Sequence, residues 1–141
     1  MGQLAANPYI NFQGHAREAL EFYHAALGGE ITLLAANPSG PPQPAGPEDS
    51  VMHGLISTDG LLIMGSDGHP DYPPTVGDNV AIALSGSSQD QDRLTEAFDT
   101  LSAGGMVKQP LKTESWGASF GYFVDKFGIN WMFNISTSTD S

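Results

Sequence analysis

The sequence contains no cysteine among its 141 residues. Disulfide bonds, thiolate metal ligands and a cysteine nucleophile are therefore excluded. Basic residues are also scarce: five Lys and Arg stand against sixteen Asp and Glu, which gives a formal net charge of −11. Because phosphate groups are bound through cationic side chains, this composition argues against nucleic acid and anionic membrane surfaces as partners. The simplest interpretation of the acidic charge is that it keeps the protein soluble.

Long apolar runs are missing as well. No stretch approaches the roughly 20 apolar residues that span a bilayer, and residues 1–7 lack the basic and apolar regions of a secretory signal. We therefore expect a cytoplasmic protein with no membrane partner. Hydrophobic residues still make up 40% of the chain, which is typical of a globular protein. The length suits one compact domain, or two small modules that share a core.

The sequence of the first half predicts a strand at 8–12, a helix at 16–27 and a second strand at 30–35. An irregular loop at 37–49 and a hairpin of strands 51–57 and 61–66 follow. The helix has an apolar face, because Leu20, Tyr23 and Leu27 recur at helical spacing. Gly28-Gly29 ends it. The loop holds five prolines and two glycines, so it is either a lid or arm, or a mobile excursion. Asp59-Gly60 between two apolar runs is a strong hairpin signal.

The second half repeats this order after residues 68–78, a stretch rich in proline and glycine that predicts a linker. We expect a strand at 79–84, a helix at 88–101, a strand at 106–111 and a hairpin of strands 118–124 and 129–135. Ser88 and Gln91 have the spacing of a capping box. Gly104-Gly105 ends this helix as another Gly-Gly pair ends the first, and both hairpins turn at an Asp followed by Gly. Each half thus reads as a βαβββ module.

This repeat predicts an α+β fold in which two tandem βαβββ modules form a cupped mixed sheet around a cleft, with the helices on the outside. The modules are expected at 6–67 and 79–136, joined by the linker at 68–78, within a single domain that spans 1–141. The cleft is the expected binding site. The closing hairpin, from Trp116 to Ile135, should hold much of the aromatic area of the core.

Two segments carry a family resemblance: NFQGHAREALEFYHAALGGEI, which begins at Asn11, and WGASFGYFVDKFGINWMFNI, which begins at Trp116. Together they resemble the PhnB-like branch of the vicinal oxygen chelate superfamily. That superfamily also contains glyoxalase I, extradiol dioxygenases and the bleomycin- and fosfomycin-resistance proteins. The resemblance covers residues 8–135, and it implies paired βαβββ modules and a homodimer whose two chains help to form each cavity.

The resemblance also implies where a metal would be bound. Metal-using members place His or Gln on the first strand of a module and Glu on its last strand, and the metal acts as a Lewis acid on two neighbouring substrate oxygens. The corresponding positions here fall near Pro8 and Asn79 on the first strands, and at Met64 and Met132 on the last. Proline and methionine do not replace oxygen and imidazole ligands, and residues 118–135 contain no Glu. We therefore expect no metal and no other cofactor.

His53 and Trp116 are the first two candidate ligand-binding residues. His53 falls inside a predicted strand, where a side chain that faces the cavity can act as acid, base or ligand. The alternative for His53 is a hydrogen bond to the backbone or a dimer contact. Trp116 opens the last hairpin, where an aromatic ring can stack on a ligand, or can serve as a hydrophobic plug or a dimer anchor.

The other candidates lie on the closing hairpin. Tyr122, Asn130 and Asn134 can line a cavity with hydrogen-bonding groups. Strand alternation places Asn130, Met132 and Asn134 on one face, opposite Trp131, and such a semi-polar face suits a cavity better than a dry core. For Met132, adaptable core packing is the alternative to ligand contact.

Three functions are compatible with these observations. The first is a small-molecule-binding protein without the usual metal site, whose ligand the sequence does not identify. The alternative is a metal-dependent lyase, isomerase or dioxygenase of the glyoxalase type, with ligands such as His53 and an Asn or Asp, or with a ligand from the partner chain. The third is a cleft filled by side chains, so that only dimerisation remains. Whether the chain is an enzyme stays open, since it has no P-loop, G-x-S-x-G or G-x-G-x-x-G motif and no glycine signature for a methyl-donor nucleotide.

Overall fold

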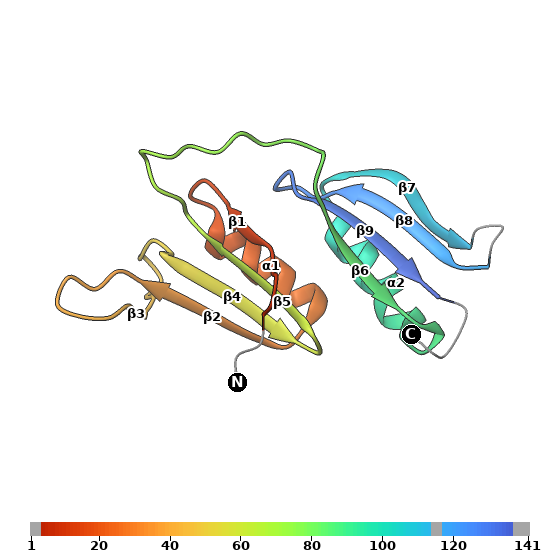
Figure 1. Cartoon of the computed structure of the whole chain (residues 1–141), viewed down its shortest axis with the longest axis horizontal. Helices are drawn as coiled ribbons and strands as arrows, with labels where there is room; N and C mark the ends of the chain where they lie inside the picture. Colours follow the sequence, from red (N-terminus) through yellow and green to blue (C-terminus); the bar gives the residue numbers. More distant parts are fainter. Residues whose placement is uncertain (1–3, 114–116, 137–141) are drawn as a thin grey trace. The chain divides into compact units, whose positions relative to one another are not determined.

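The computed structural model describes residues 4–113 and 117–136, and the chain divides into two compact units between Thr75 and Val76. Figure 1 shows both units with their elements labelled. The first unit contains β1 (Tyr9–Asn11), α1 (Ala16–Leu27), β2 (Glu30–Ala35), β3 (Gln43–Pro44), β4 (His53–Thr58) and β5 (Leu61–Ser66). The second contains β6 (Ala81–Gly86), the 3-10 helix η1 (Ser88–Asp90), α2 (Gln91–Ser102), β7 (Met106–Thr113), β8 (Ser119–Val124) and β9 (Asn130–Ile135). In the described ranges, neither helix has the length and apolar character needed to cross a membrane.

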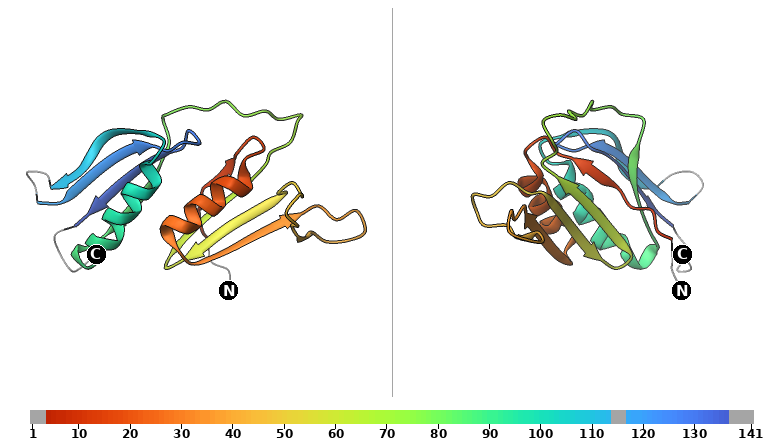
Figure 2. Two further views of the ribbon diagram at one scale, coloured as in Figure 1. Left: turned by 180° about the vertical axis from the view of Figure 1, so that it is seen from behind. Right: turned by 60° about the vertical axis from the view of Figure 1, so that its left-hand side comes forward.

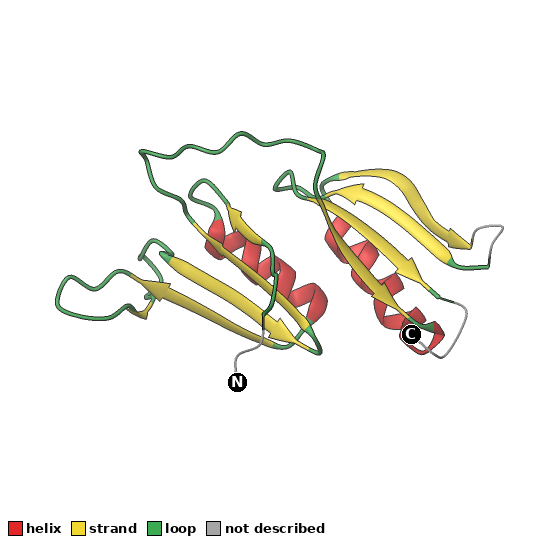
Figure 3. Cartoon of the chain, viewed as in Figure 1, coloured by secondary structure: helices red, strands yellow, loops and turns green. Residues whose placement is uncertain are grey.

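Both units have the same strand arrangement. The order across the first sheet is β1-β5-β4-β2-β3, and across the second it is β6-β9-β8-β7. In each sheet the first strand of the unit runs parallel to the last, and the other neighbours are antiparallel. Each unit has one helix against one face of its sheet (Figures 2 and 3). The predicted α+β fold of two tandem βαβββ modules is confirmed, with the short β3 added to the first.

The helix of the first unit packs on its sheet through the predicted apolar face. It buries Ala16, Ala19, Leu20, Tyr23 and Leu27. On the sheet, β4 carries Gly54 next to α1, and β5 carries Gly65 next to Phe12. A Cβ at Gly54 would lie 2.6 Å from Leu20 Cδ1, and a Cβ at Gly65 would overlap the Phe12 ring. The absence of a side chain at Gly54 therefore lets α1 lie close to the sheet, and its absence at Gly65 makes room for the Phe12 ring.

The core of the second unit is aromatic. Phe98 of α2 makes edge-to-face contacts with Phe123 and Phe133, at ring-centroid distances of 4.8 and 5.3 Å. Trp131 lies parallel to Phe123 at 6.2 Å, and the hairpin residues Phe123, Trp131 and Phe133 are all fully buried. The prediction that the closing hairpin supplies much of the aromatic core is confirmed for these residues. Trp116 lies outside the described residues.

The two hairpin turns use their Asp and Gly residues in different ways. In the β4–β5 turn, Asp59 and Gly60 both have positive φ, 40° and 81°, as a two-residue type I′ turn requires. In the β8–β9 turn, the buried Asp125 accepts hydrogen bonds from the backbone N–H of Phe127 and Ile129, and its other oxygen accepts one from Trp131 Nε1 at 2.9 Å. Asp125 is thus the turn residue that the sequence predicted, and it also fixes the core tryptophan.

Several predicted features differ in detail. The capping box is formed by Ser87 and Asp90, not by Ser88 and Gln91: Asp90 Oδ2 accepts from Ser87 N–H at 3.0 Å. The box lies one residue earlier than predicted, because the carboxylate of Asp90 accepts this hydrogen bond as well as a glutamine amide would, and the 3-10 helix η1 precedes α2 there. The strand expected at 79–84 begins at Ala81 instead, and the strand expected at 106–111 extends to Thr113.

The proline-rich segment at 37–49 is attached to the first unit at several points. It contains β3, which pairs with the end of β2. Arg17 of α1 donates from Nη2 to the carbonyl oxygens of Gly46, at 2.5 Å, and Asp49, at 3.1 Å. Asp49 Oδ2 accepts from Gly46 N–H within the segment. The expected irregular loop is thus an arm, and Arg17 of α1 anchors the C-terminal end of this arm.

Candidate functional site

In each sheet, one face packs on the helix, and we call the other the helix-free face. On β5, Ile63 and Gly65 are buried towards α1, and Met64 between them is half-buried on the helix-free face. On β9, Trp131, Phe133 and Ile135 are buried, and Met132 and Asn134 alternate with them. The prediction that Asn130, Met132 and Asn134 share a face opposite Trp131 and Phe133 is confirmed by the pairing of β9 with β8, although Asn130 is itself buried.

Strand pairing aligns a row of side chains across the helix-free face of the first sheet. Tyr9 pairs with Met64, Met64 with Leu55, and Leu55 with Thr32. Leu55 and Met64 are half-buried, and Tyr9 is 52% exposed. This row is an apolar surface with an aromatic residue at its edge strand.

The second sheet has the equivalent row on its own helix-free face. Ala83 pairs with Met132, Met132 with Tyr122, and Tyr122 with Gln109. Lys108 Nζ lies 5.6 Å from the centroid of the Tyr122 ring, a distance at which a cation and an aromatic face attract. Because the two units share one topology, Met64 corresponds to Met132, and Tyr9 corresponds to Ala83.

Strand register shows which first-strand residues lie beside the two methionines. The neighbour of Met64 is Tyr9, one residue after Pro8, and the neighbour of Met132 is Ala83, not Asn79. Side chains alternate along a strand, so a shift of one residue moves the position to the other face.

The residues at these corrected positions do not fit the usual metal site of the superfamily. A phenol, a methyl group and two thioethers do not form the imidazole and carboxylate set that binds a hard divalent ion. Within the part of the chain that the structure describes, no group of three or more His, Asp or Glu is placed to hold a metal ion.

His53 begins β4 and makes a specific contact with the first strand. Tyr9 Oη and His53 Nδ1 are 3.2 Å apart, at hydrogen-bonding distance. The two rings also stack, with centroids 5.6 Å apart and planes inclined by 24°. The hydrogen-bond partner of His53 is therefore the side chain of Tyr9, and not a backbone group as one alternative expected.

Asn130 is the most buried of the candidate residues that the structure describes, with 4% of its surface exposed. Its Nδ2 donates to the carbonyl oxygens of Gly77, at 3.1 Å, and Val80, at 3.3 Å. Asn130 therefore fastens the segment that leads into β6, and its Oδ1 has no hydrogen-bond partner among the described residues. Asn134, on the same strand, is exposed.

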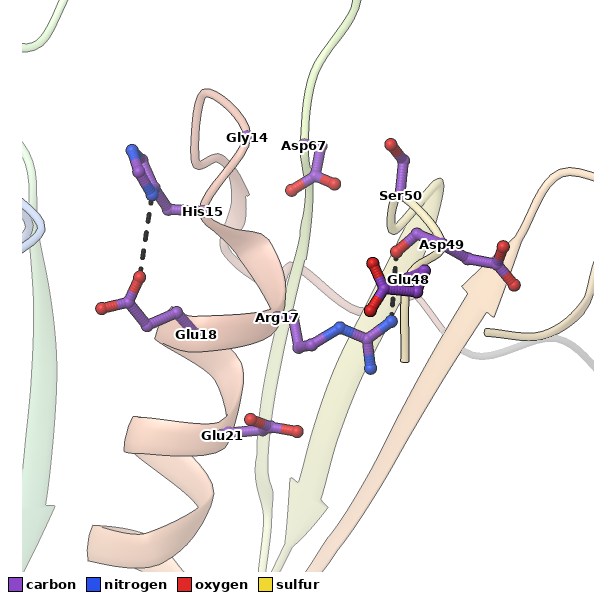
Figure 4. Close-up of a pocket in the computed structure, with 9 residues that line it drawn as sticks. All are labelled: Gly14, His15, Arg17, Glu18, Glu21, Glu48, Asp49, Ser50 and Asp67. Carbon is purple, nitrogen blue, oxygen red and sulfur yellow. Dashed lines mark hydrogen bonds and ion pairs between the residues drawn. The ribbon is translucent and has the colours of Figure 1, made fainter. Parts of the chain in front are cut away.

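Two hollows in the first unit lie at the start of α1 and not on these rows. The larger, of about 390 Å³, is lined by Gly14, His15, Arg17, Glu18, Glu21, Glu48, Asp49, Ser50 and Asp67 (Figure 4). A second of about 360 Å³ is lined by Asn11, Gln13, Gly14, Asp67, Gly68, His69, Pro70, Pro73 and Pro74. Asp67 lines both hollows, and each of its oxygens accepts a backbone hydrogen bond, from the N–H of Ala16 at 2.9 Å and from that of Val51 at 2.8 Å. Arg17 and Asp67 thus serve to hold loops together at the larger hollow.

Sequence reasoning missed Tyr9, Arg17 and Asp67. Tyr9 could have been found, because it is the polar aromatic residue in a short strand that alternates with Pro8 and Ile10. The contacts of Arg17 and Asp67 join residues that lie 16 to 51 positions apart in the chain, and no local pattern indicates them.

Comparison with known proteins gives concordant results. Residues 5–134 match the family model described as 3-demethylubiquinone-9 3-methyltransferase. Protein YjdN of Escherichia coli strain K12 is 28% identical over 140 residues, which cover 92% of this chain and 93% of YjdN. The crystal structure of protein PA1353 from Pseudomonas aeruginosa is 37% identical, with a TM-score of 0.76 over 95% of this chain and 98% of that one. The putative 3-demethylubiquinone-9 3-methyltransferase, PhnB protein, from Bacillus cereus is 22% identical, with a TM-score of 0.66 over 94% of this chain and 100% of that one.

Proposed function

The chain belongs to the PhnB-like family, a branch of the vicinal oxygen chelate superfamily. From that premise we propose that it binds a small organic molecule on the helix-free faces of its sheets, without the metal that is usual in the superfamily. The observation that carries the proposal is the pair of equivalent rows across the two sheets. Half-buried Leu55, Met64, Tyr122 and Met132 offer apolar surface there, and polar groups flank them. Such a mixture is typical of small-molecule sites.

The methyltransferase activity in the family description is not part of this proposal. The chain has no glycine-rich βαβ signature for a methyl-donor nucleotide, and each unit carries its helix in a βαβββ module instead. The two rows suit a molecule that is held by apolar contacts and a few hydrogen bonds. Binding or sequestration is therefore the activity that we propose.

Native mass spectrometry of protein purified without added metal tests the absence of metal and the presence of a ligand together. We expect a co-purified small organic molecule, no stoichiometric divalent ion, and a melting temperature that chelators leave unchanged. A divalent ion bound one to one, whose removal lowers the melting temperature, would contradict the metal-free site.

A matched pair of variants tests the location. Met64→Lys places a charge in the row of the first sheet and should abolish binding of the co-purified molecule. Val107→Lys is the control, because Val107 is 45% exposed on the edge strand β7 and pairs with Phe123, a residue of the helix-covered face. Equal loss of the ligand in both variants, with unchanged melting temperatures, would argue against a site on the helix-free face.

A further inference from the structure

Tyr9 and His53 contact each other across β5 through both a hydrogen bond and ring stacking, which packing of the sheet alone does not require. The two residues belong to β1 and β4, the strands on either side of β5, so their side chains reach towards each other above β5. Adjacent strands lie about 4.8 Å apart, and only long side chains on the same face can meet across an intervening strand. Tyr9 and His53 meet through both a hydrogen bond and ring stacking, which fixes the orientation of the imidazole ring.

The hydrogen bond also selects the tautomer of His53. A neutral imidazole has one N–H donor and one acceptor nitrogen, and the bond made at one nitrogen decides which form is present. A phenol O–H is a good donor, whereas its oxygen is a weak acceptor because the ring delocalises its lone pair. This difference favours the tautomer in which Tyr9 O–H donates to Nδ1 and the proton of His53 resides on Nε2. Within the described residues, Tyr9 is the hydrogen-bond partner of His53, so the Nε2–H is available to a ligand.

The second unit shows that this pair is not a requirement of the fold. Counting two residues back from the equivalent positions Leu55 and Tyr122 aligns His53 with Phe120. The second sheet thus has Ala83 and Phe120 where the first has Tyr9 and His53, and it forms the same strand order. The pair is a property of the first module alone.

We propose that Tyr9 and His53 form the polar end of the ligand site on the first sheet, where His53 Nε2–H donates a hydrogen bond to a carbonyl or carboxylate oxygen of the ligand. The apolar body of that ligand lies on Leu55 and Met64, the two residues that follow Tyr9 in the row of the first sheet. Tyr9 is a positioning residue that holds the tautomer and the ring plane. This inference rests on the proposed function, and it adds the chemical class: an apolar or aromatic molecule that carries an acceptor oxygen.

The tautomer is tested first, without any ligand. Long-range ¹H–¹⁵N correlation spectra of the imidazole should show an unprotonated Nδ1 and a protonated Nε2 for His53 in the wild-type protein. In Tyr9→Phe the donor to Nδ1 is lost, and the Nδ1 resonance should move towards that of an unbonded imidazole nitrogen. A His53 that carries its proton on Nδ1 in the wild-type protein would overturn the assignment, and a merely structural role of Tyr9 would leave the nitrogen shifts in place.

Binding is tested with benzoate, an aromatic carboxylate, and benzylamine, which has the same ring but no acceptor oxygen. Benzoate should shift the resonances of Leu55, Met64 and His53 Nε2, and benzylamine should not. His53→Phe copies the second unit, so the fold is retained, and it should weaken benzoate binding about tenfold, the factor that corresponds to about 1.4 kcal/mol. Tyr9→Phe should weaken it less, and His69→Phe, a change at an exposed histidine of the segment after β5, should have no effect.

The outcomes separate this inference from the function on which it rests. If benzoate shifts Leu55 and Met64 equally in the wild-type protein and in His53→Phe, the inference is overturned and the proposed site remains. If neither probe nor the co-purified molecule perturbs either helix-free face, the proposed function fails and the inference fails with it.

Discussion

Asn130 shows how one residue can satisfy a sequence pattern for one role and take a second role in the structure. The alternation of β9 places it with Met132 and Asn134 on a semi-polar face, which favours a ligand-binding role. In the structure it is 96% buried and donates both of its Nδ2 protons to the backbone of the segment before β6. Its predicted contact with a ligand stays a prediction, whereas its structural hydrogen bonds are clear.

The amide of Asn130 can be tested by exchange for a carboxylate. Asn130→Asp replaces two donors by an acceptor that faces the carbonyl oxygens of Gly77 and Val80, so we expect the free energy of unfolding to fall by about 3 kcal/mol. Asn134→Asp makes the same chemical change at an exposed site on the same strand and should change stability by less than about 0.5 kcal/mol. Urea unfolding of the two variants measures the difference. Equal effects would show that the Nδ2 hydrogen bonds do not stabilise the fold.

At the scale of elements, the contact of α2 with its sheet depends on a missing side chain. Gly121 of β8 lies under Phe98: a Cβ there would be 2.5 Å from Phe98 Cε2 and 3.0 Å from Leu111 Cα. Gly121→Ala should therefore overpack the core and lower stability by roughly 2 kcal/mol. Gly40→Ala is the control, since the nearest atom to its Cβ would be Asn37 Nδ2 at 3.8 Å. Thermal unfolding compares them, and a Gly121→Ala protein as stable as the control would contradict this account of the packing.

The arm at 37–49 is a second element whose behaviour depends on one side chain. Arg17 donates two hydrogen bonds to the arm, and their loss in Arg17→Ala should raise the rate of cleavage after Glu48 by a glutamyl endopeptidase about tenfold, through easier local opening. Arg17→Lys keeps the charge but loses the planar fork, and should give an intermediate rate. Limited proteolysis followed by mass spectrometry measures the rates. Identical cleavage in all three proteins would indicate that the arm does not depend on Arg17.

At the scale of the whole molecule, we propose that two copies of the chain associate, as the family resemblance implies. The exposed apolar residues Val80 and Met106 are available to such a contact. Each chain carries a formal charge of −11, so the two copies repel each other and salt screens the repulsion. Light scattering at micromolar concentration should give twice the 14.9 kDa chain mass, and the dimer should tighten as salt is raised. A monomer at every salt concentration would contradict the proposal.

Much of the fold could be predicted from local patterns. The bounds of α1 and β2 are those predicted. An apolar face at helical spacing indicates α1, and the Gly-Gly pair that ends α1 stands directly before β2. The Asp59-Gly60 turn was predicted from its two residues alone. The common strand order of the two units follows from a repeat that is visible in the sequence. These features are local or periodic, and neighbouring residues therefore suffice to specify them.

The candidate site depends on contacts that no local pattern contains. The pair of Tyr9 and His53 joins residues 44 apart in the chain, and the parallel register of β1 on β5 brings Tyr9, not Pro8, next to Met64. The second hydrogen-bonding role of Asn130 arises because residues 77–80 fold back over the start of β9. The sequence by itself determined the elements, the repeat and which residues alternate on each strand. Only the tertiary structure decided which of those residues meet, because strand register is set by packing across the sheet and on the helix.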